Sequence, residues 1–270
     1  MNKLKDYIEN VCGGFAKLNS MTKYPPIPVY HEMGDRGRLT DKRVDIGDGP
    51  WFFTEKVDGT NARIIMTPYG WVIGSREELL CAEGDLVGNP ALGIVQTLRV
   101  YANNLQTFCA PKEGFTVFYP EVYGGNTTKA SRFYTSAKDE FGAMVFDVAK
   151  FSDEQVQLLS LMKRSVIAAW REQDRDRFDI IDQKGAKGLR SLLPAGLDCV
   201  HPLQVNSLPG NIEETYAWMV EKVKDFWMDS VFVNDPTNME GFVVRSADGS
   251  RVFKLRFQDY RRRIKVLQKA

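Results

Sequence analysis

The chain has 270 residues, of which 43% are hydrophobic and 26% charged, so it can bury a large core and is not globally disordered. Its net charge of +1 is uneven: residues 251–270 hold eight basic residues against the single Asp259, a net +7, whereas the first 250 residues sum to −6. It contains no run of eighteen apolar residues and no signal-peptide core, which argues against a membrane protein and predicts a soluble, cytoplasmic one.

The first fifty residues predict a helix followed by extended chain and a loop. Residues 1–20 have the apolar spacing of a short amphipathic helix, whose apolar face comprises Leu4, Ile8, Val11 and Phe15. The proline-rich stretch 24–28 excludes helix and favours extended chain. The stretch 34–50 is polar and contains glycine, and it predicts a loop.

From Trp51 onward, short β-rich runs alternate with longer helical patterns. In chain order we predict strands at 51–57, 63–67 and 71–74, a helix at 91–108, strands at 115–123 and 141–149, helices at 152–170 and 211–227, strands at 241–245 and 251–257, and a closing basic helix. Residues 124–132 predict a loop, 68–70 and 247–249 predict hairpin turns, and Ser152 predicts a helix N-cap.

This order of elements contains no internal repeat and no low-complexity linker. It predicts one α+β unit built on antiparallel strands. Within it we separate an N-terminal helix and extended segment at 1–50, packed on the core, from a domain at 51–270.

Lys56 is the first candidate reactive residue. It ends a predicted strand, and Gly59 allows a tight turn directly behind it. A lysine amine is a nucleophile only when it is unprotonated, and nearby cations or a bound metal favour that form. The spacing Lys-x-Asp-Gly arises by chance in about one chain in twenty of this size, so other residues must support the assignment.

Further candidates follow Lys56 in order along the chain: Glu121, Phe146, Glu240, Lys254 and Arg256. Both glutamates stand at the ends of predicted strands, the phenylalanine can stack on a purine, and the last two cations alternate with apolar residues and so share one sheet face. Each feature alone is more often structural, as a strand-end charge, a core aromatic or a solvated basic edge. Their joint presence in this order indicates chemistry.

This ordered set resembles the covalent nucleotidyltransferase superfamily of polynucleotide ligases and mRNA capping enzymes. The motifs of that superfamily match Lys56-Asp58-Gly59, Glu121, Phe146-Asp147, Glu240-Gly241 and Lys254, and Ser75-Arg76-Glu77 resembles the arginine segment after the first hairpin. DNA ligases and capping enzymes usually have arginine where Asn61 stands. The sequence Gly59-Thr60-Asn61 is most like the RNA ligase 2 family, which includes phage nick-sealing ligases, although Asp58 replaces the histidine common in that branch.

The resemblance implies an ATP-grasp-like nucleotidyltransferase domain of antiparallel sheets flanked by helices. DNA ligases and capping enzymes carry an OB-fold after their last shared motif. Only fourteen residues follow Arg256, too few for such a domain, so we expect no C-terminal OB-fold. Arg256 stands where a second lysine is common, which keeps the charge but changes the donor geometry.

The resemblance also implies an ATP-dependent RNA ligase that joins 5′-phosphate and 3′-hydroxyl ends through lysyl-AMP and an adenylylated 5′ end. Lys56 would carry AMP, Lys254 and Arg256 would neutralise the α-phosphate, and Glu121 and Glu240 would hold Mg²⁺ or Mn²⁺ through water. The nucleotide contacts would come from Phe146, stacked on adenine, and from Glu55, Asp58, Asn61, Arg76, Glu121, Glu240 and Lys254. The expected substrates are RNA ends or a nicked duplex in RNA repair, bound by a monomer whose basic tail contacts phosphates.

Three alternatives remain open. The nearest is a minimal ATP-dependent DNA ligase, because the sugar of the substrate cannot be inferred from these motifs, and a capping guanylyltransferase fits less well. A non-catalytic protein that binds nucleic-acid ends would have no need of Lys56. The four cysteines and two histidines are scattered and match no zinc pattern, which argues against a zinc module.

Overall fold

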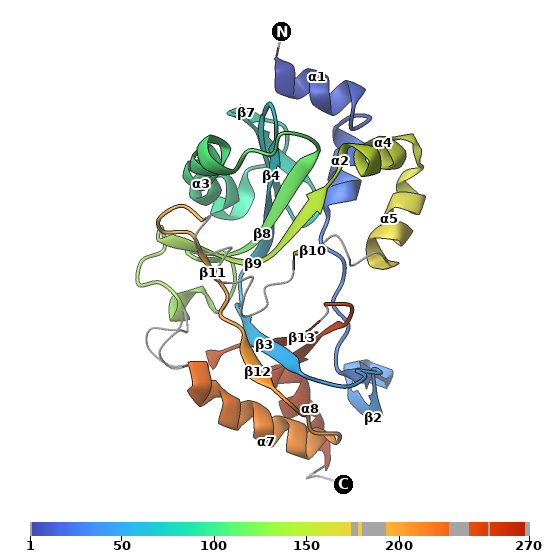
Figure 1. Ribbon diagram of the computed structural model, residues 1–270. Coiled ribbons are helices and arrows are strands. Elements are labelled where there is room, and N and C mark those ends of the chain that lie inside the picture. The colour runs from blue at the N-terminus through green and yellow to red at the C-terminus, as the bar shows by residue number, and fades with distance from the viewer. Residues whose placement is uncertain (1, 174–177, 180–192, 227–237, 248, 268–270) are drawn as a thin grey trace. The chain divides into compact units, whose positions relative to one another are not determined.

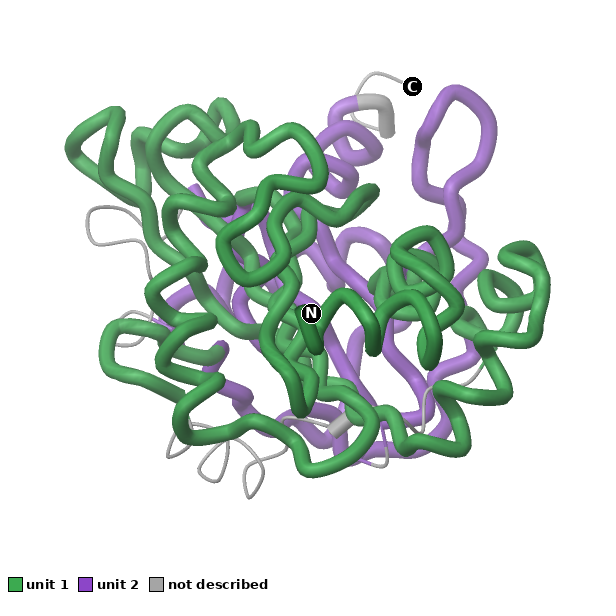
Figure 2. The backbone as a smooth tube through the Cα atoms, turned by 90° about the horizontal axis from the view of Figure 1, so that it is seen from above, with its two compact units in different colours: residues 1–25, 59–199 green, residues 26–58, 200–270 purple. Residues whose placement is uncertain are grey.

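The computed structural model describes residues 2–173, 178–179, 193–226, 238–247 and 249–267 (Figure 1). The chain forms two compact units, coloured separately in Figure 2: a first unit of residues 1–25 and 59–199, and a second unit of residues 26–58 and 200–270. Both consist of mainly antiparallel sheets with helices, which confirms the α+β class. The sequence did not indicate this division, in which distant parts of the chain combine into a second sheet.

Each unit has its own set of helices, short 3₁₀ helices (η) and strands. The first unit comprises α1 (Lys3–Asn10), α2 (Phe15–Thr22), β4 (Thr60–Thr67), β5 (Gly70–Ser75), β6 (Leu79–Ala82), β7 (Asp85–Leu86), η2 (Ala91–Gly93), α3 (Ile94–Cys109), β8 (Phe115–Gly124), η3 (Ser131–Phe133), β9 (Phe141–Phe151), α4 (Asp153–Leu161), α5 (Arg164–Gln173), β10 (Phe178–Asp179) and β11 (Asp198–Cys199). The second unit comprises β1 (His31–Met33), η1 (Asp35–Gly37), β2 (Leu39–Arg43), β3 (Trp51–Lys56), β12 (Leu203–Val205), α7 (Ile212–Lys222), η4 (Val223–Phe226), β13 (Gly241–Ser246), β14 (Val252–Arg256) and α8 (Phe257–Leu267).

The sheet of the first unit has helices on both faces (Figure 1). Its strand order is β10-β9-β8-β4-β5-β6-β7, and β11 pairs with β9 in parallel. Ile64 and Met66 of β4 pack in a core with α3, and Ile65 packs in a second core with α1, α2, α4 and α5. Because successive strand residues point to opposite faces, burial of both faces explains the consecutive apolar residues Ile64, Ile65 and Met66 in β4.

The second unit contains the four-stranded sheet β12-β3-β13-β14. Phe53 of β3 contacts the rings of Trp218 on α7, Phe226 and Phe242, with ring centroids 5.3, 5.3 and 5.5 Å from its own. Aromatic side chains bury large areas, so this cluster supplies much of the core on the helix-covered face of the sheet. The strands β1 and β2 form a separate antiparallel pair.

His31 of β1 is fully buried in the second unit. Its Nε2 lies 3.2 Å from the Gly210 carbonyl, which can only accept, so Nε2–H donates and Nδ1 accepts from the Tyr260 hydroxyl at 2.8 Å. This arrangement uses both ring nitrogens of the neutral form. Burial lowers the pKa of His31 below its ordinary value of 6.5.

Two of the predicted helices are interrupted. The helix predicted at 1–20 is divided into α1 and α2, because Gly13 and Gly14 have φ angles of +75° and +97°. The helix predicted at 152–170 ends at Leu161 and restarts at Arg164, since Met162 has an extended backbone. The predicted N-cap is confirmed: the Ser152 hydroxyl accepts from the Gln155 N–H, and the Gln155 side chain accepts from the Ser152 N–H.

The loop predicted at 34–50 is partly wrong, because residues 39–43 form β2 and pair with β1. The strands and the helix predicted between residues 51 and 149 are confirmed within a few residues at each end. Trp227 of the predicted helix at 211–227 and Asp248 of the predicted hairpin lie outside the described residues. No described helix combines the length and the apolar character that crossing a bilayer requires.

Candidate functional site

Lys56 is the last residue of β3, at one end of the four-stranded sheet of the second unit. It lies opposite Gly241 of β13, which in turn lies opposite Arg256 of β14. Directly opposed residues of antiparallel strands point to the same face, so Lys56 and Arg256 share a face with only a glycine between them. Lys254 is two residues from Arg256 on the same strand and shares that face. The register therefore gathers three predicted cations on one side of the sheet.

Gly241 is required at the centre of this row. Its φ is +155°, and a Cβ atom there would lie 1.8 Å from the Leu255 carbonyl oxygen. No side chain fits such a close approach of two backbones. The glycine also leaves room beside the Lys56 amine, because it puts no side chain between Lys56 and Arg256.

Glu240, directly before Gly241, contacts Lys56. Its carboxylate accepts a hydrogen bond from Lys56 Nζ in an ion pair, and the two side chains are 17% and 24% exposed, so water reaches both. The Glu240 carbonyl accepts from the Phe257 N–H at 3.0 Å, which ties the start of β13 to the start of α8. The predicted nucleophile and a predicted metal ligand are thus in direct contact. The amine must leave this carboxylate and be unprotonated before it can attack a phosphorus atom.

Arg256 is held by a residue whose role the sequence did not indicate. Its Nε donates to the Asp259 carboxylate at 2.7 Å, and Asp259 is only 2% exposed. The pair spans i to i+3 at the first turn of α8. A nearly buried carboxylate that binds one edge of the guanidinium fixes its direction and leaves further N–H donors on the same group.

The backbone of Lys254 is fixed by the segment that follows the proline-rich stretch. The Lys254 N–H donates to the Pro28 carbonyl at 2.9 Å, and the Tyr30 N–H donates to the Lys254 carbonyl at 3.1 Å. Val29 forms a parallel bridge with Lys254. Residues 28–30 therefore run along β14 and cover its edge.

Glu55 points away from the face that carries Lys56. It lies opposite Phe242, on the aromatic face of the same sheet, and is 7% exposed. A nucleotide contact at Glu55 therefore has to come from its backbone, and the predicted contact stays a prediction. Asp58 follows the end of β3 and is half-buried; its predicted role is likewise untested.

In the first unit, Asn61 of β4 lies opposite Glu121 of β8. The two side chains therefore share one face of the eight-stranded sheet. A Cβ atom on Gly59 would lie 2.3 Å from the Val122 carbonyl oxygen, so the glycine of the Lys-x-Asp-Gly sequence is required by the close approach of two strands. The sequence alone suggested that a tight turn requires this glycine. The contact with the Val122 carbonyl excludes any side chain at Gly59 more strictly than a turn would.

Phe146 reaches the face of Asn61 and Glu121 because β9 contains a bulge. The register of β8 with β9 shifts by one residue there, and Phe146 has no opposite residue. Val145 and Val148 both pack in the core against α3. The bulge therefore turns the two residues between them, Phe146 and Asp147, toward the other face.

Tyr24 contacts this bulge, although the sequence alone marked it only as the start of the proline-rich stretch. Its hydroxyl donates to the Asp147 carboxylate at 2.8 Å. Its ring lies edge-on to the rings of Phe146 and Tyr119, with centroids 5.0 Å away in both cases. A contact between residues more than a hundred positions apart leaves no local signal in the sequence.

Arg76 lies in the turn after β5 and its side chain is 67% exposed. The preceding Ser75 is opposite Ala62, the neighbour of Asn61 in β4, so Arg76 lies at the same end of the sheet as Asn61. Its Nε is 3.6 Å from the Glu77 carboxylate, an exposed ion pair that restrains it weakly. The side chain can thus reorient toward a ligand.

The donors available for a metal ion are the carboxylates of Glu121 and Glu240. Oxygen ligands of this kind suit Mg²⁺ or Mn²⁺, and each residue keeps part of its surface exposed, as an ion that retains water needs. Glu121 belongs to the first unit and Glu240 to the second. The described residues contain no group of three or more His, Cys, Asp or Glu side chains that could hold a metal ion, and the two predicted ligands stay a prediction.

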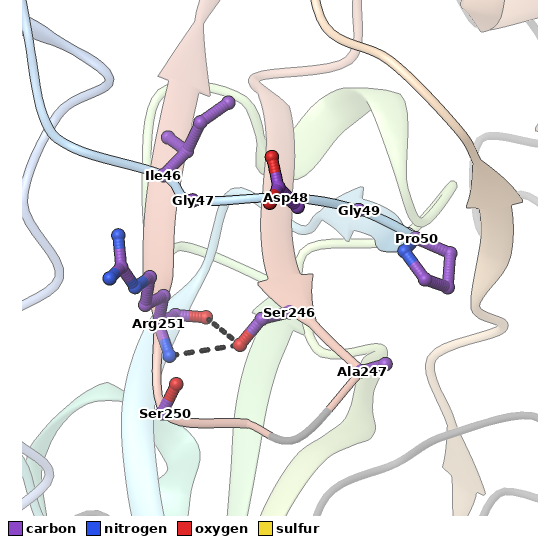
Figure 3. A pocket seen from close by; sticks show the side chains of 9 residues that line it. All are labelled: Ile46, Gly47, Asp48, Gly49, Pro50, Ser246, Ala247, Ser250 and Arg251. Carbon is purple, nitrogen blue, oxygen red and sulfur yellow. Dashed lines mark hydrogen bonds between the residues drawn. The ribbon is translucent and has the colours of Figure 1, made fainter.

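A pocket of about 350 Å³ lies at the other end of the sheet of the second unit (Figure 3). It is lined by Ile46, Gly47, Asp48, Gly49, Pro50, Ser246, Ala247, Ser250 and Arg251. The Ser246 hydroxyl accepts from the Arg251 N–H at 3.0 Å, and Arg251 pairs with Asp45 at 2.9 Å. Because Ser246 is opposite Trp51, five residues before Lys56, this pocket contains none of the predicted site residues.

Comparison with known proteins gives one family match. The sequence pattern of the RNA ligase family matches residues 49–267. No curated protein sequence matches the chain.

Solved structures of Naegleria gruberi RNA ligase resemble the fold. A lysine-to-alanine mutant with ATP and Mn is 14% identical, with a TM-score of 0.50, and the match covers 91% of this chain and 64% of that one. The same ligase with pyrophosphate is 14% identical, with a TM-score of 0.49, and the match covers 90% of this chain and 64% of that one. At this identity the likeness concerns the fold alone, and the chain spans less than two thirds of the length of those ligases.

Proposed function

Because the chain belongs to the RNA ligase family, we propose that it is an ATP-dependent RNA ligase that joins 5′-phosphate and 3′-hydroxyl ends through lysyl-AMP. One observation carries this proposal. A lysine at the end of β3 contacts a glutamate and shares a sheet face with Lys254 and Arg256. A nucleophilic amine beside cations is the arrangement that attack on a polyanionic nucleotide requires.

In the first step, Lys56 Nζ forms a bond to the α-phosphorus of ATP while the bond to the bridging oxygen breaks and pyrophosphate leaves. The amine loses its proton, and the product is lysyl-AMP. In the second step an oxygen of the 5′-phosphate attacks this phosphorus and breaks its bond to Nζ. In the third step the 3′-hydroxyl attacks the 5′-phosphate, loses its proton and displaces AMP, which seals the strand.

Lys254 and Arg256 have the charge that these steps need. Phosphoryl transfer depends mainly on alignment and on neutralising charge at the phosphate oxygens. The Arg256 guanidinium is directed by Asp259, so it is ordered before the nucleotide binds, and the Lys254 backbone is fixed by residues 28–30. Preordered charges cost less reorganisation at the moment of reaction.

Glu121 and Glu240 are the residues we propose to hold Mg²⁺ or Mn²⁺, partly through water. The ion supplies a positive charge that stabilises the leaving pyrophosphate. Glu240 also binds the Lys56 amine in the structure, so it would keep the nucleophile in place before the nucleotide arrives. A solved structure of the Naegleria ligase contains ATP and Mn, which supports a nucleotide and a divalent ion as the cofactors.

The adenine is proposed to stack on Phe146, which the bulge in β9 directs to the face of Asn61 and Glu121. Asn61 and Arg76 are proposed to contact the nucleotide or the 5′-phosphate. Asp58 is proposed to support the turn behind Lys56.

The RNA strand is proposed to contact α8. Arg261, Arg262 and Lys265 are exposed on this helix, and Lys269 of the predicted basic tail lies outside the described residues. Cations of this kind bind phosphates without reading sequence. We further propose a monomer that acts in RNA repair in the cytoplasm, where the four cysteines, all thiols in the structure, would stay reduced.

The proposal is tested by incubating the protein with ATP labelled at the α-phosphate and a divalent ion. We expect label on the denatured wild-type protein and none on Lys56→Ala. Lys42→Ala is the matched control, since Lys42 is also a strand lysine paired with a carboxylate, at 3.0 Å from Glu32. No label on the wild type would leave a non-catalytic binding protein as the better account.

Matched nicked duplexes decide the substrate. They differ only in the sugar of the strand that carries the 3′-hydroxyl. We expect faster sealing with ribose. Equal or faster sealing with deoxyribose would favour the minimal DNA ligase.

A further inference from the structure

The bulge at Phe146 needs support from outside its strand. A residue in a regular antiparallel strand is restrained by the side chain opposite, but Phe146 has no opposite residue on the neighbouring strand β8. Tyr24 supplies a restraint in two ways: its ring makes a T-shaped contact with Phe146, and its hydroxyl donates to the adjacent Asp147. One residue of the N-terminal segment thus contacts both bulged side chains, beside Tyr119 at Phe146 and the Val148 N–H at Asp147.

Tyr24 is itself fixed by the end of α2, two residues before it. The last turn of a helix leaves carbonyl groups without helical partners. The Asn19 carbonyl accepts from Arg63 at 3.1 Å, and the Ser20 carbonyl accepts from Arg171. Positive charge also suits the negative end of the helix dipole. Two guanidinium groups therefore anchor the chain at the point where it leaves the helix.

Both guanidinium groups are buried, so their positive charges must be compensated inside the protein. Arg63 is 1% exposed, and burial lowers its pKa to about 10, so it remains charged at neutral pH. Burial also lowers the pKa of Arg171. A buried charge is tolerated only where hydrogen bonds compensate it, and here those bonds go to α2.

The sequence restricts Tyr24 further. It is followed by Pro25, and a residue before proline is kept in extended conformations. Its neighbour Lys23 pairs with Glu77 at 2.8 Å. The backbone on both sides of Tyr24 is therefore constrained before any ligand binds.

From these contacts we propose that Tyr24 is a positioning residue of the nucleotide site, which holds Phe146 and Asp147 so that Phe146 presents its ring to the adenine. The inference rests on the proposed function, in which Phe146 receives the base. It also assigns a task to residues 1–25, which lie outside the family match but belong to the first unit. Tyr24 acts through Phe146 and does not touch the reacting atoms.

The test compares Tyr24→Phe and Tyr24→Leu with Tyr7→Phe in the full chain. Tyr24→Phe removes the hydrogen bond to Asp147 and keeps the ring, and Tyr24→Leu also removes the ring contacts. The control Tyr7→Phe removes another buried hydroxyl of the first unit, which donates to the Gly114 carbonyl at 3.0 Å just before the opposite end of β8. The rate of lysyl-AMP formation is measured against ATP concentration. Inhibition by tripolyphosphate, which has phosphates but no base, is measured in parallel.

We expect Tyr24→Phe to raise KM for ATP about threefold to tenfold, the range of a typical single hydrogen bond, and Tyr24→Leu to raise it more. The maximal rate and the inhibition constant of tripolyphosphate should stay unchanged, because the phosphate-binding residues are intact. Unchanged KM in both Tyr24 variants would overturn the inference. So would an equal rise in KM and in the tripolyphosphate constant, which indicates general damage. Absence of label on the wild-type protein would refute the proposed function instead.

Discussion

Replacing Gly241 by alanine should separate β13 from β14 beside the Lys56–Glu240 pair. The new Cβ would lie 1.8 Å from the Leu255 carbonyl oxygen, whereas ordinary contacts begin at 3.4 Å. The two backbones must therefore move apart by about 1.6 Å, well beyond what close-packed interiors absorb without cost. Overpacking of this kind costs about 1–3 kcal/mol, and the unfavourable φ adds about 1–3 kcal/mol.

The sum is a large part of the stability of a typical domain, about 5–15 kcal/mol. We expect urea denaturation followed by tryptophan fluorescence to show a lower free energy of unfolding for Gly241→Ala. Lysyl-AMP formation should also fall under conditions where the variant is folded, because Glu240 and Arg256 are both displaced from Lys56. The reason is geometric: Lys56, Gly241 and Arg256 are directly opposed on three neighbouring strands, and Glu240 directly precedes Gly241.

Gly37→Ala is the matched control in the same unit. Gly37 also has a positive φ, +65°, but the nearest atom to an added Cβ is Arg262 Nη1 at 3.5 Å, an ordinary contact. This variant has the backbone strain without the clash, so we expect a loss of only about 1 kcal/mol and normal activity. Equal losses of stability in the two variants, or full activity of Gly241→Ala, would refute the reasoning.

Three further predictions address pH, nucleic acid and metal. Burial lowers the pKa of His31 below 6.5, so its contribution to the free energy of unfolding is complete above pH 6.5 and decreases as pH falls below that value. His31→Gln should flatten this dependence of the free energy of unfolding on pH, and an unchanged dependence would contradict the assignment. Removing the charges of Arg261 and Arg262 should weaken RNA binding. The slope of log affinity against log salt concentration should fall by about 1 for each phosphate that α8 no longer neutralises. An unchanged slope would exclude α8 from the interface. Glu121→Gln should raise the concentration of Mg²⁺ or Mn²⁺ needed for half-maximal adenylylation, and an unchanged requirement would argue against Glu121 as a ligand.

Much of the fold follows from local patterns in the sequence. The N-cap at Ser152 and the alternation in 251–257 each depend on neighbours within a few residues, and both were predicted. The division into two units was not, because it depends on β3 pairing with β12 and β13 from the far end of the chain. Such pairings are decided by tertiary packing, which periodicity does not report.

The candidate site likewise contains features that the sequence predicts and features that depend on tertiary packing. The sequence predicted that Lys254 and Arg256 share a face, and the strand register confirms it. It could not predict that Glu55 faces away from the site or that a bulge turns both Phe146 and Asp147 to one side. The bulge shifts the alternation of side chains along β9 by one residue, and no distinctive residue type marks it in this sequence. Strict alternation therefore assigns the wrong sheet face to either Phe146 or Asp147. Tyr24 and Asp259 were missed because their roles depend on contacts made only in the folded chain.

The most direct test of the central claim is to locate the AMP. The protein is incubated with ATP and a divalent ion and digested, and the modified peptide is sequenced by mass spectrometry. The account predicts AMP on Lys56 through a phosphorus–nitrogen bond, and release of the AMP when RNA with a 5′-phosphate is added. AMP on another residue, or no adduct on a folded protein, would contradict it.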